Sequence, residues 1–388
     1  MNTTNDVVIA GIGQTDVGEH YTISLRDLAL MALEAAIQDA GGLRPDILFI
    51  GNMLAPTASH QAHLGALISD YGGLEGIEAS TIEAGGASGA AALRMGYMAI
   101  KSGEARVALV LGVEKVTDQL GPSAEAAQTL GEDSDYEAVQ GVTPNAQAAL
   151  LMRRYMHDNN VPHEAFAGFP ITAHANAVTN PHAIYRNPLS MEAYQNSGLV
   201  SDPLNMFDVA PPADGAAAVL LTLRESLPAN YPQPLVRLTG SSLVTDRLAI
   251  HDRTDPLAFD AARKSVERAC RQAGIMPGDV DFFELYDSYS IVAALSLEAA
   301  GFSGRGEGWK MAQGAKLSRD GELPIATFGG LKARGNPGGA TGVYQAVEAT
   351  LQLRQQAGAN QVLDARRALI QCLAGPASSA VTHILEVL

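Results

Sequence analysis

Two cysteines, Cys270 and Cys372, are the thiols of this 388-residue chain, and they lie far apart in the sequence. Two thiols are too few for a disulfide framework or a cysteine-based zinc site. Histidines and carboxylates show no metal-ligand spacing either, so we expect no metal. The small number of cysteines favours a reducing, cytoplasmic location. A lone cysteine is a nucleophile only where its surroundings stabilise the thiolate. Cys270 has no motif around it, and we interpret it as structural.

Two glycine-rich segments, 82–89 and 329–342, each lead into a predicted helix and are the most distinctive sequences in the chain. The elements that must position the first of them alternate between short apolar runs and helical periodicity, which is typical of a largely parallel sheet covered by helices. Strands are predicted at 7–13, 47–50, 79–83 and 106–113, and helices at 24–40 and 88–101. Ser24 is the expected N-cap of its helix.

The stretch from about residue 114 to 205 differs from its surroundings and is predicted to be a mostly helical insertion. We expect its acidic run, 132–135, to be a solvated loop tip. Strands return at 216–223 and 235–239. A helix at 257–272 and a strand at 280–285 then follow with the spacing of 24–40 and 47–50, which indicates two halves related by duplication.

Composition restricts the partners of the chain. Apolar residues make up 47% and charged residues 18%, so the chain folds, and its net charge is −16 with no basic run. Nucleic acid and anionic membrane surfaces are therefore disfavoured as partners. No apolar stretch is long enough to span a membrane. Residues 1–6 carry no basic segment, so we expect no signal peptide.

Four separated segments resemble the thiolase superfamily, in particular its SCP2-type members. Residues 82–89 are similar to the turn that carries the nucleophile, and 329–342 to the Gly-His-Pro loop. Residues 284–289 are similar to the segment with a catalytic His or Asn, and 373–388 to the final hairpin. The resemblance implies an α/β thiolase fold, five layers in the order αβαβα, with halves at 1–235 and 236–388 and a loop domain inserted in the first. It also implies a homodimer in which strand 79–83 or 106–113 pairs across a two-fold axis, and a coenzyme A thioester as substrate with no covalently bound cofactor.

The sequence departs from this family at the positions that do the chemistry. Gly86 stands where a thiolase has its nucleophilic cysteine, and glycine cannot form an acyl-enzyme. Asn336 stands at the position of the His in the Gly-His-Pro loop, and Tyr286 at that of the third motif. Cys372 remains, but without a nucleophile beside it we interpret it as a buried structural residue. Acyl transfer through a covalent intermediate is therefore disfavoured.

A thioester enolate can also form without covalent attachment, by retro-aldol cleavage of a β-hydroxyacyl-CoA. Asn336 and backbone N–H groups near Gly86 and Gly375 are the expected oxyanion donors. Tyr286 or Tyr344 is the expected base, and Tyr286 is favoured because it occupies the catalytic position of the family. We expect Asp287, beside it, to cap the following helix, and the alternative is that it orients the catalytic tyrosine.

These departures resemble the thiolase-like aldolases that shorten steroid side chains as CoA thioesters. That resemblance implies a small partner protein with an OB-fold and often a zinc ribbon. Two alternatives stay open. One is an acetyl-CoA acyltransferase with an atypical nucleophile, and the other is a non-catalytic acyl-CoA-binding subunit of a complex.

Overall fold

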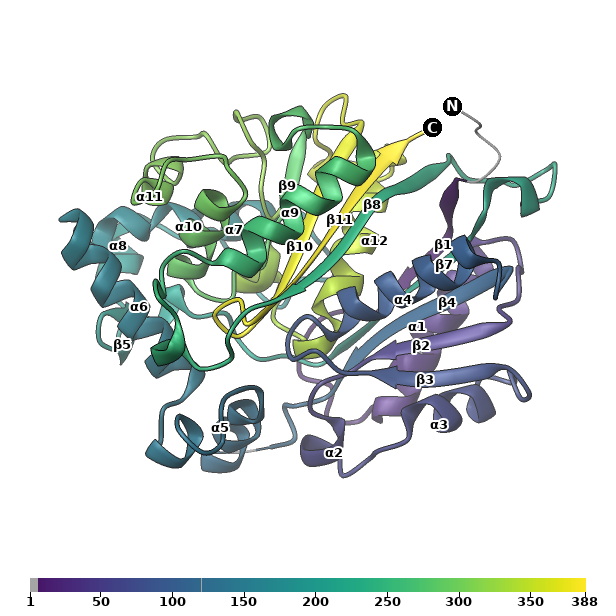
Figure 1. Ribbon diagram of the computed structural model, residues 1–388, viewed down its shortest axis with the longest axis horizontal. Coiled ribbons are helices and arrows are strands. Elements are labelled where there is room, and N and C mark those ends of the chain that lie inside the picture. Colours follow the sequence, from purple (N-terminus) through teal and green to yellow (C-terminus); the bar gives the residue numbers. More distant parts are fainter. Residues whose placement is uncertain (1–5, 120) are drawn as a thin grey trace.

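The computed structural model describes residues 6–119 and 121–388. Residues 1–5, on which the expectation about a signal peptide depends, lie outside the described part of the chain. The described strands form a nine-stranded sheet in the order β3-β2-β4-β7-β1-β8-β11-β10-β9, together with a separate two-stranded hairpin. Helices cover the large sheet on all of its faces (Figure 1).

The first half contains one five-stranded portion of this sheet. Its main elements are β1 (Val7–Gln14), α1 (Leu25–Asp39), β2 (Ile47–Gly51), β3 (Glu78–Ile82), α4 (Ser88–Ser102), β4 (Val107–Glu114) and β7 (Gly215–Leu223), with the short helices α2 (Ala55–Ala58) and α3 (Leu64–Tyr71). Strand β2 runs parallel to β3 and β4, whereas β7 is antiparallel to β4 and β1. Ser24 caps α1 as predicted, since its hydroxyl accepts a hydrogen bond from the Asp27 amide.

The second half repeats this arrangement, as the recurring sequence spacing predicts. It consists of β8 (Val236–Thr245), α9 (Asp260–Ala273), β9 (Phe282–Glu284), α10 (Ser290–Ala299), α11 (Gly308–Met311), α12 (Thr341–Leu353), β10 (Arg367–Ala374) and β11 (Ser379–Val387). Its strand order, β8-β11-β10-β9, matches β1-β7-β4-β2 of the first half. The counterpart of the edge strand β3 is reduced to an isolated parallel bridge between Phe283 and Ile325.

The two halves join along one short edge and enclose a layer of helices. The pairs Val8–Arg237 and Ile9–Val236 connect β1 to β8. Helices α4 and α12 contact each other and lie between the two portions of the sheet, whereas α1 and α9 cover the outer faces. The apolar side chains of α4 and α12 share one buried cluster with both portions. The fold therefore has the five layers expected of a thiolase.

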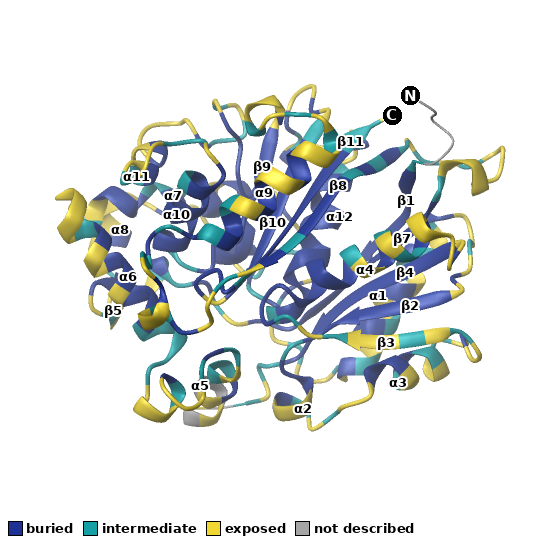
Figure 2. Ribbon diagram, viewed as in Figure 1, coloured by how far each residue is buried: buried dark blue, intermediate teal, exposed yellow. Residues whose placement is uncertain are grey.

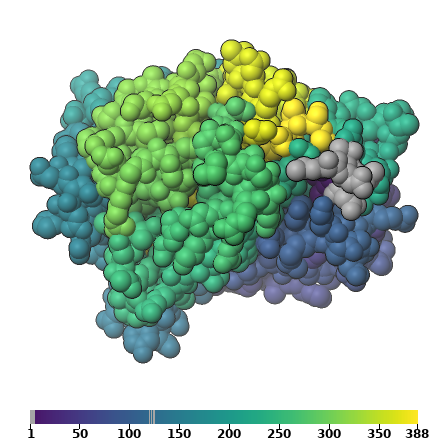
Figure 3. Space-filling view, turned by 45° about the horizontal axis from the view of Figure 1, so that its top comes forward, coloured from purple at the N-terminus to yellow at the C-terminus, as the bar shows by residue number. Residues whose placement is uncertain are grey.

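The insertion between β4 and β7 is mostly helical, as predicted. It contains α5 (Pro122–Gln128), α6 (Pro144–Asn159), α7 (Gly168–Ala177), α8 (Met191–Gln195) and the hairpin of β5 (Leu199–Ser201) and β6 (Leu204–Asn205). In Figure 3 these blue to teal residues lie at one end of the molecule beside the green residues of the second half. Helix α6 contacts α10, so the insertion is anchored to the half that follows it.

Burial distinguishes the two strands expected to pair between subunits. Figure 2 shows the central strands dark and the edge strand β3 largely exposed. Strand β4 is bonded to β2 on one side and β7 on the other, so only β3 of these two strands presents an edge. The alternative that strand 106–113 pairs with its copy in a second subunit is therefore wrong.

No helix among the described residues is long and apolar enough to cross a membrane.

Candidate active site

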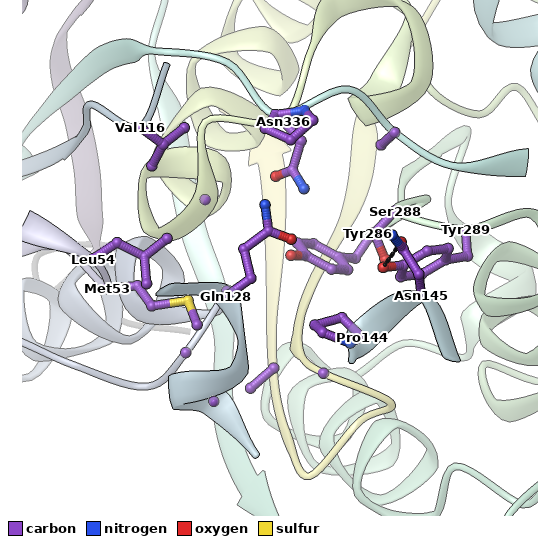
Figure 4. A pocket seen from close by; sticks show the side chains of 18 of the residues that line it. Met53, Leu54, Val116, Gln128, Pro144, Asn145, Tyr286, Ser288, Tyr289 and Asn336 are labelled. Carbon is purple, nitrogen blue, oxygen red and sulfur yellow. Dashed lines mark hydrogen bonds between the residues drawn. The ribbon is translucent and has the colours of Figure 1, made fainter. Parts of the chain in front are cut away.

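A pocket of about 270 Å³ opens where the insertion meets the loops at the ends of the strands. Four residues singled out from the sequence line it: Gly86, Tyr286, Asn336 and Gly375. The remaining lining residues are mostly apolar and include Met53, Leu54, Val116, Pro144, Val209, Ala210, Pro212 and Ala374 (Figure 4). The long sequence separation of these segments shows that both halves and the insertion contribute to one site.

The turn before α4 leaves no space for a side chain at position 86. Its backbone is held by Ser88, whose hydroxyl donates to the Gly85 carbonyl at 2.6 Å and accepts from the Ala84 amide at 2.9 Å. An ideal Cβ on Gly86 would lie 2.3 Å from the hydroxyl oxygen of Tyr286 and 2.9 Å from the Leu373 carbonyl oxygen. The tyrosine hydroxyl therefore occupies the space into which a side chain at position 86 would extend.

Tyr286 follows β9 and is buried, with only 6% of the residue exposed. Burial raises the pKa of its hydroxyl far above the usual value, and a hydrogen bond with the Asn336 side chain partly offsets this rise. The hydroxyl is therefore protonated at neutral pH. A protonated phenol beside an amide can donate a hydrogen bond to a developing oxyanion, but it is a poor proton acceptor.

Asn336 is held by backbone pairing with the strand-like segment before β7. Its amide donates to the Pro211 carbonyl at 2.9 Å, and its carbonyl accepts from the Ala213 amide at 3.1 Å. Its side-chain oxygen accepts a hydrogen bond from Thr341 at 3.3 Å, so the side-chain nitrogen remains the group that can donate. Pairing with the segment before β7 and the hydrogen bond from Thr341 thus hold the Asn336 side chain in place.

Cys372 lies behind the pocket wall and does not line it. Its thiol donates to the Gly86 carbonyl at 3.3 Å and is completely buried. Burial raises the pKa of this thiol strongly. Since the thiolate is the reactive form, this geometry agrees with the structural role expected from the sequence.

Tyr344 lies outside the pocket that the described residues form. Its hydroxyl contacts Thr15 on the loop after β1, at 3.0 Å from the side-chain oxygen and 3.1 Å from the carbonyl oxygen. The ring is fully buried in the central layer, and the Arg334 guanidinium lies 4.9 Å from its centroid. The structure therefore does not bring Tyr344 together with Tyr286, and packing explains its position.

Asp287 does not cap α10, contrary to the expectation from sequence. The helix begins at Ser290, and no side chain caps it. The Asp287 carboxylate instead accepts from the Leu331 amide at 2.7 Å, in the glycine-rich loop. Gly330 has a φ of +54°, and an added Cβ there would lie 2.5 Å from this carboxylate. Asp287 thus ties the loop of Asn336 to the segment of Tyr286.

Two buried carboxylates hold the apolar wall of the pocket that Met53, Leu54 and Val116 form. Glu114, at the end of β4, accepts hydrogen bonds from the backbone amides of Met53, Leu54 and Gly339 at 2.9 to 3.0 Å. Burial raises its pKa to about 7. Asp214, before β7, accepts from the Val116 amide at 2.7 Å. These contacts fix the apolar wall through backbone groups, as a positioning framework would.

Polar residues from the insertion also line the pocket, and sequence reasoning missed them. Gln128, at the end of α5, extends its amide toward Tyr286 and Asn336 (Figure 4). Tyr289 donates to the Asn145 side chain at 2.9 Å. Glu132 is only 9% exposed, so the expectation of a solvated tip is wrong for this residue, although Ser134 and Asp135 are exposed. A short acidic run carries no signal that tells its buried member from its exposed ones.

Two family models match the chain. Residues 7–225 match the thiolase N-terminal domain, and residues 242–387 match the thiolase C-terminal domain-like family. The chain is 38% identical to an acetyl-CoA acetyltransferase of Methanothermobacter thermautotrophicus, over 98% of this chain and 99% of the relative. It is 34% identical to an acetyl-CoA acetyltransferase of Methanocaldococcus jannaschii, over 90% of each.

A solved structure described as an Ltp2-ChsH2(DUF35) aldolase is similar throughout. Its TM-score is 0.83 at 25% sequence identity, and the match covers 99% of this chain and 98% of that one. The similarity therefore extends over both halves and the insertion between them.

Proposed function

The chain belongs to the thiolase superfamily, and within that family we propose that it cleaves the Cα–Cβ bond of a β-hydroxyacyl-CoA by a retro-aldol reaction. One observation carries this proposal: the Tyr286 hydroxyl fills the space that a nucleophile at position 86 would need. A site without that nucleophile, yet with donors at the same place, suits a reaction through a free thioester enolate. The likeness to a structure described as an aldolase supports the same reaction class.

The reaction needs three things from the site. A base removes the proton of the β-hydroxyl, the Cα–Cβ bond breaks, and its electron pair becomes the thioester enolate while the β-carbon leaves as a ketone or aldehyde. Donors hold the enolate oxygen. The enolate then takes a proton at Cα and leaves as the shortened acyl-CoA, so the proton removed at the start is returned and no further reactant is consumed.

Tyr286 and Asn336 are the proposed oxyanion donors, with backbone groups near Gly86 and Gly375. The raised pKa of Tyr286 suits a donor that remains protonated, so we assign it this role in place of the base expected from sequence. Tyr344 has no role in the proposed reaction, because its hydroxyl contacts Thr15 outside the pocket.

Acyl transfer is the second candidate, because two relatives are named acetyl-CoA acetyltransferase. It would need a nucleophile other than residue 86. Cys372 is the thiol in contact with Gly86, but its hydrogen bond to the Gly86 carbonyl and its raised pKa oppose thiolate formation. A covalent acyl-enzyme would favour this candidate.

The proposed enzyme works as a cytoplasmic homodimer in lipid or steroid metabolism and has a small OB-fold and zinc-ribbon partner. The exposed edge of β3 supports dimer formation, because an unpaired edge can extend a sheet between subunits. The similar aldolase structure is described with a second component, ChsH2(DUF35), which supports a partner of that kind.

The test is single-turnover cleavage of 3-hydroxy-3-methylbutyryl-CoA, with and without a candidate partner protein. Retro-aldol cleavage gives acetone and acetyl-CoA. Wild type is expected to form both products in equal amounts, and Tyr286→Phe is expected to be slower. Tight CoA-thioester binding without turnover in any combination would favour a non-catalytic subunit instead.

A further inference from the structure

Glu132 brings into the pocket a carboxylate that no described side chain neutralises. The residue follows a short 3-10 turn after α5, lines the pocket and is more than nine-tenths buried. Both carboxylate oxygens are buried, and neither has a hydrogen-bond partner among the described residues. No Lys or Arg among the described residues forms an ion pair with Glu132. Such a group is costly to bury, and sites of this kind are often functional.

The groups that face Glu132 increase this cost. Glu137, from the same loop, adds a second negative charge, and burial is the larger effect; together they raise the pKa of Glu132 to about 8. Glu137 is itself satisfied, because it accepts from the backbone amides of Asp133 and Ile250. Burial raises the pKa of Tyr289, at the start of α10, and the charge of Glu132 raises it further. Arg253 is the cation of this region, and its charge interacts with Glu137, whereas the only charge that shifts the pKa of Glu132 among the described residues is that of Glu137.

Glu132 is also the one carboxylate among the described residues that line the pocket. The other titratable groups there are the hydroxyls of Tyr286 and Tyr289, whose pKa values burial raises well above neutrality. The amides of Gln128, Asn145 and Asn336 do not titrate. A reaction that begins by removing a hydroxyl proton therefore finds one suitable acceptor in this lining.

We infer that Glu132 is the general base of the pocket, an inference that rests on the proposed retro-aldol function. Its carboxylate takes the proton of the β-hydroxyl as the Cα–Cβ bond breaks and the carbonyl product forms. The enolate oxygen is held on the other side by Tyr286 and Asn336. The same Glu132, now protonated, returns the proton to Cα and is again a carboxylate. Glu132 thus carries the proton through the turnover, while Tyr286 and Asn336 stabilise the enolate oxygen.

The test compares Glu132→Gln with the matched control Asp135→Asn, which removes one negative charge from an exposed position three residues away. Cleavage of 3-hydroxy-3-methylbutyryl-CoA by wild type and both variants is measured under single-turnover conditions from pH 6 to 9. Circular dichroism checks that all three proteins fold. Loss of a general base typically lowers the rate by about 10²–10⁴-fold. We expect this loss in Glu132→Gln, with KM nearly unchanged and without the rise in rate toward pH 8 that we expect of wild type. Asp135→Asn is expected to keep the wild-type profile.

Cleavage by Glu132→Gln within tenfold of wild type, with the same pH profile, would overturn the assignment and leave retro-aldol cleavage intact. If wild type itself does not cleave the probe, the proposed function fails, and hydrogen exchange decides on Glu132 separately. Exchange of the α-protons of acetyl-CoA in deuterium oxide requires a base but no aldol bond. Exchange lost in Glu132→Gln supports the assignment, whereas exchange that persists, or is absent from wild type, overturns it.

Discussion

Substitution of Gly86 tests whether the Tyr286 hydroxyl has taken the place of the family nucleophile. In Gly86→Ala the new Cβ would meet the hydroxyl oxygen at 2.3 Å, the attached ring carbon at 3.0 Å and the Leu373 carbonyl oxygen at 2.9 Å. Overpacking of this kind costs about 1–3 kcal/mol. Tyr286→Phe removes the nearest of the three atoms and leaves the other two. We therefore expect Gly86→Ala to cost about 1 kcal/mol less in the Phe background, which is within the range for residues in contact.

The assay is thermal unfolding of wild type, the two single variants and the double variant. For a chain of this length, 1 kcal/mol corresponds to a shift in Tm of roughly 1 °C, so the four values must be measured side by side. Gly278→Ala is the matched control, because its backbone is unstrained and a Cβ there meets no atom within 4 Å. If Gly86→Ala lowers the free energy of unfolding equally in both backgrounds, or in neither, the Tyr286 hydroxyl does not occupy the space of a side chain at position 86, and the reasoning is refuted. Gly86→Cys meets the same hydroxyl and should not restore thiolysis of acetoacetyl-CoA.

Three further outcomes are expected. Tyr286→Phe should slow cleavage by about 10²–10³-fold, as loss of an oxyanion donor does. Tyr344→Phe should keep its rate within tenfold of wild type but lose about 1–3 kcal/mol of stability, because Thr15 loses its buried partner. Rates and Tm values of both variants check this. The folded-state pKa of Glu132 is raised from 4.5 to about 8, so ionisation destabilises the fold increasingly between these pH values. Glu132→Gln should therefore raise stability by about 3 kcal/mol at pH 7 and by much less at pH 5; an equal shift in Tm at both pH values would contradict this. Light scattering at micromolar concentration should give a dimer mass, and a monomer mass would refute the homodimer.

Much of the fold could be predicted because it depends on local patterns. Apolar runs and glycines located strands such as β2 and β4, and the repeated spacing after α1 and α9 indicated the duplicated halves. These signals come from periodicity and capping within single elements. The pairing partners of a strand are not local, which is why sequence could not decide whether β3 or β4 presents the edge of the sheet.

The site was predictable where motifs determine the backbone and not where side-chain direction decides. Gly86, Tyr286 and Asn336 lie on turns that match family motifs, and all three line the pocket. Tyr344 lies in the first turn of α12, which follows such a motif, but its direction on the helix carries its hydroxyl to Thr15. Glu132 lies on an irregular loop, where burial follows from tertiary packing and leaves no periodic trace.

Turnover in deuterium oxide tests the central claim, cleavage through a free enolate, most directly. The enzyme, with any partner it needs, is mixed with 3-hydroxy-3-methylbutyryl-CoA, and the products and the intact protein are weighed by mass spectrometry. A non-covalent retro-aldol reaction predicts acetone, acetyl-CoA carrying solvent deuterium at Cα, and a protein mass that stays unchanged throughout. A protein mass increased by an acyl group during turnover would contradict the claim and would place this chain with the acyltransferases of its family.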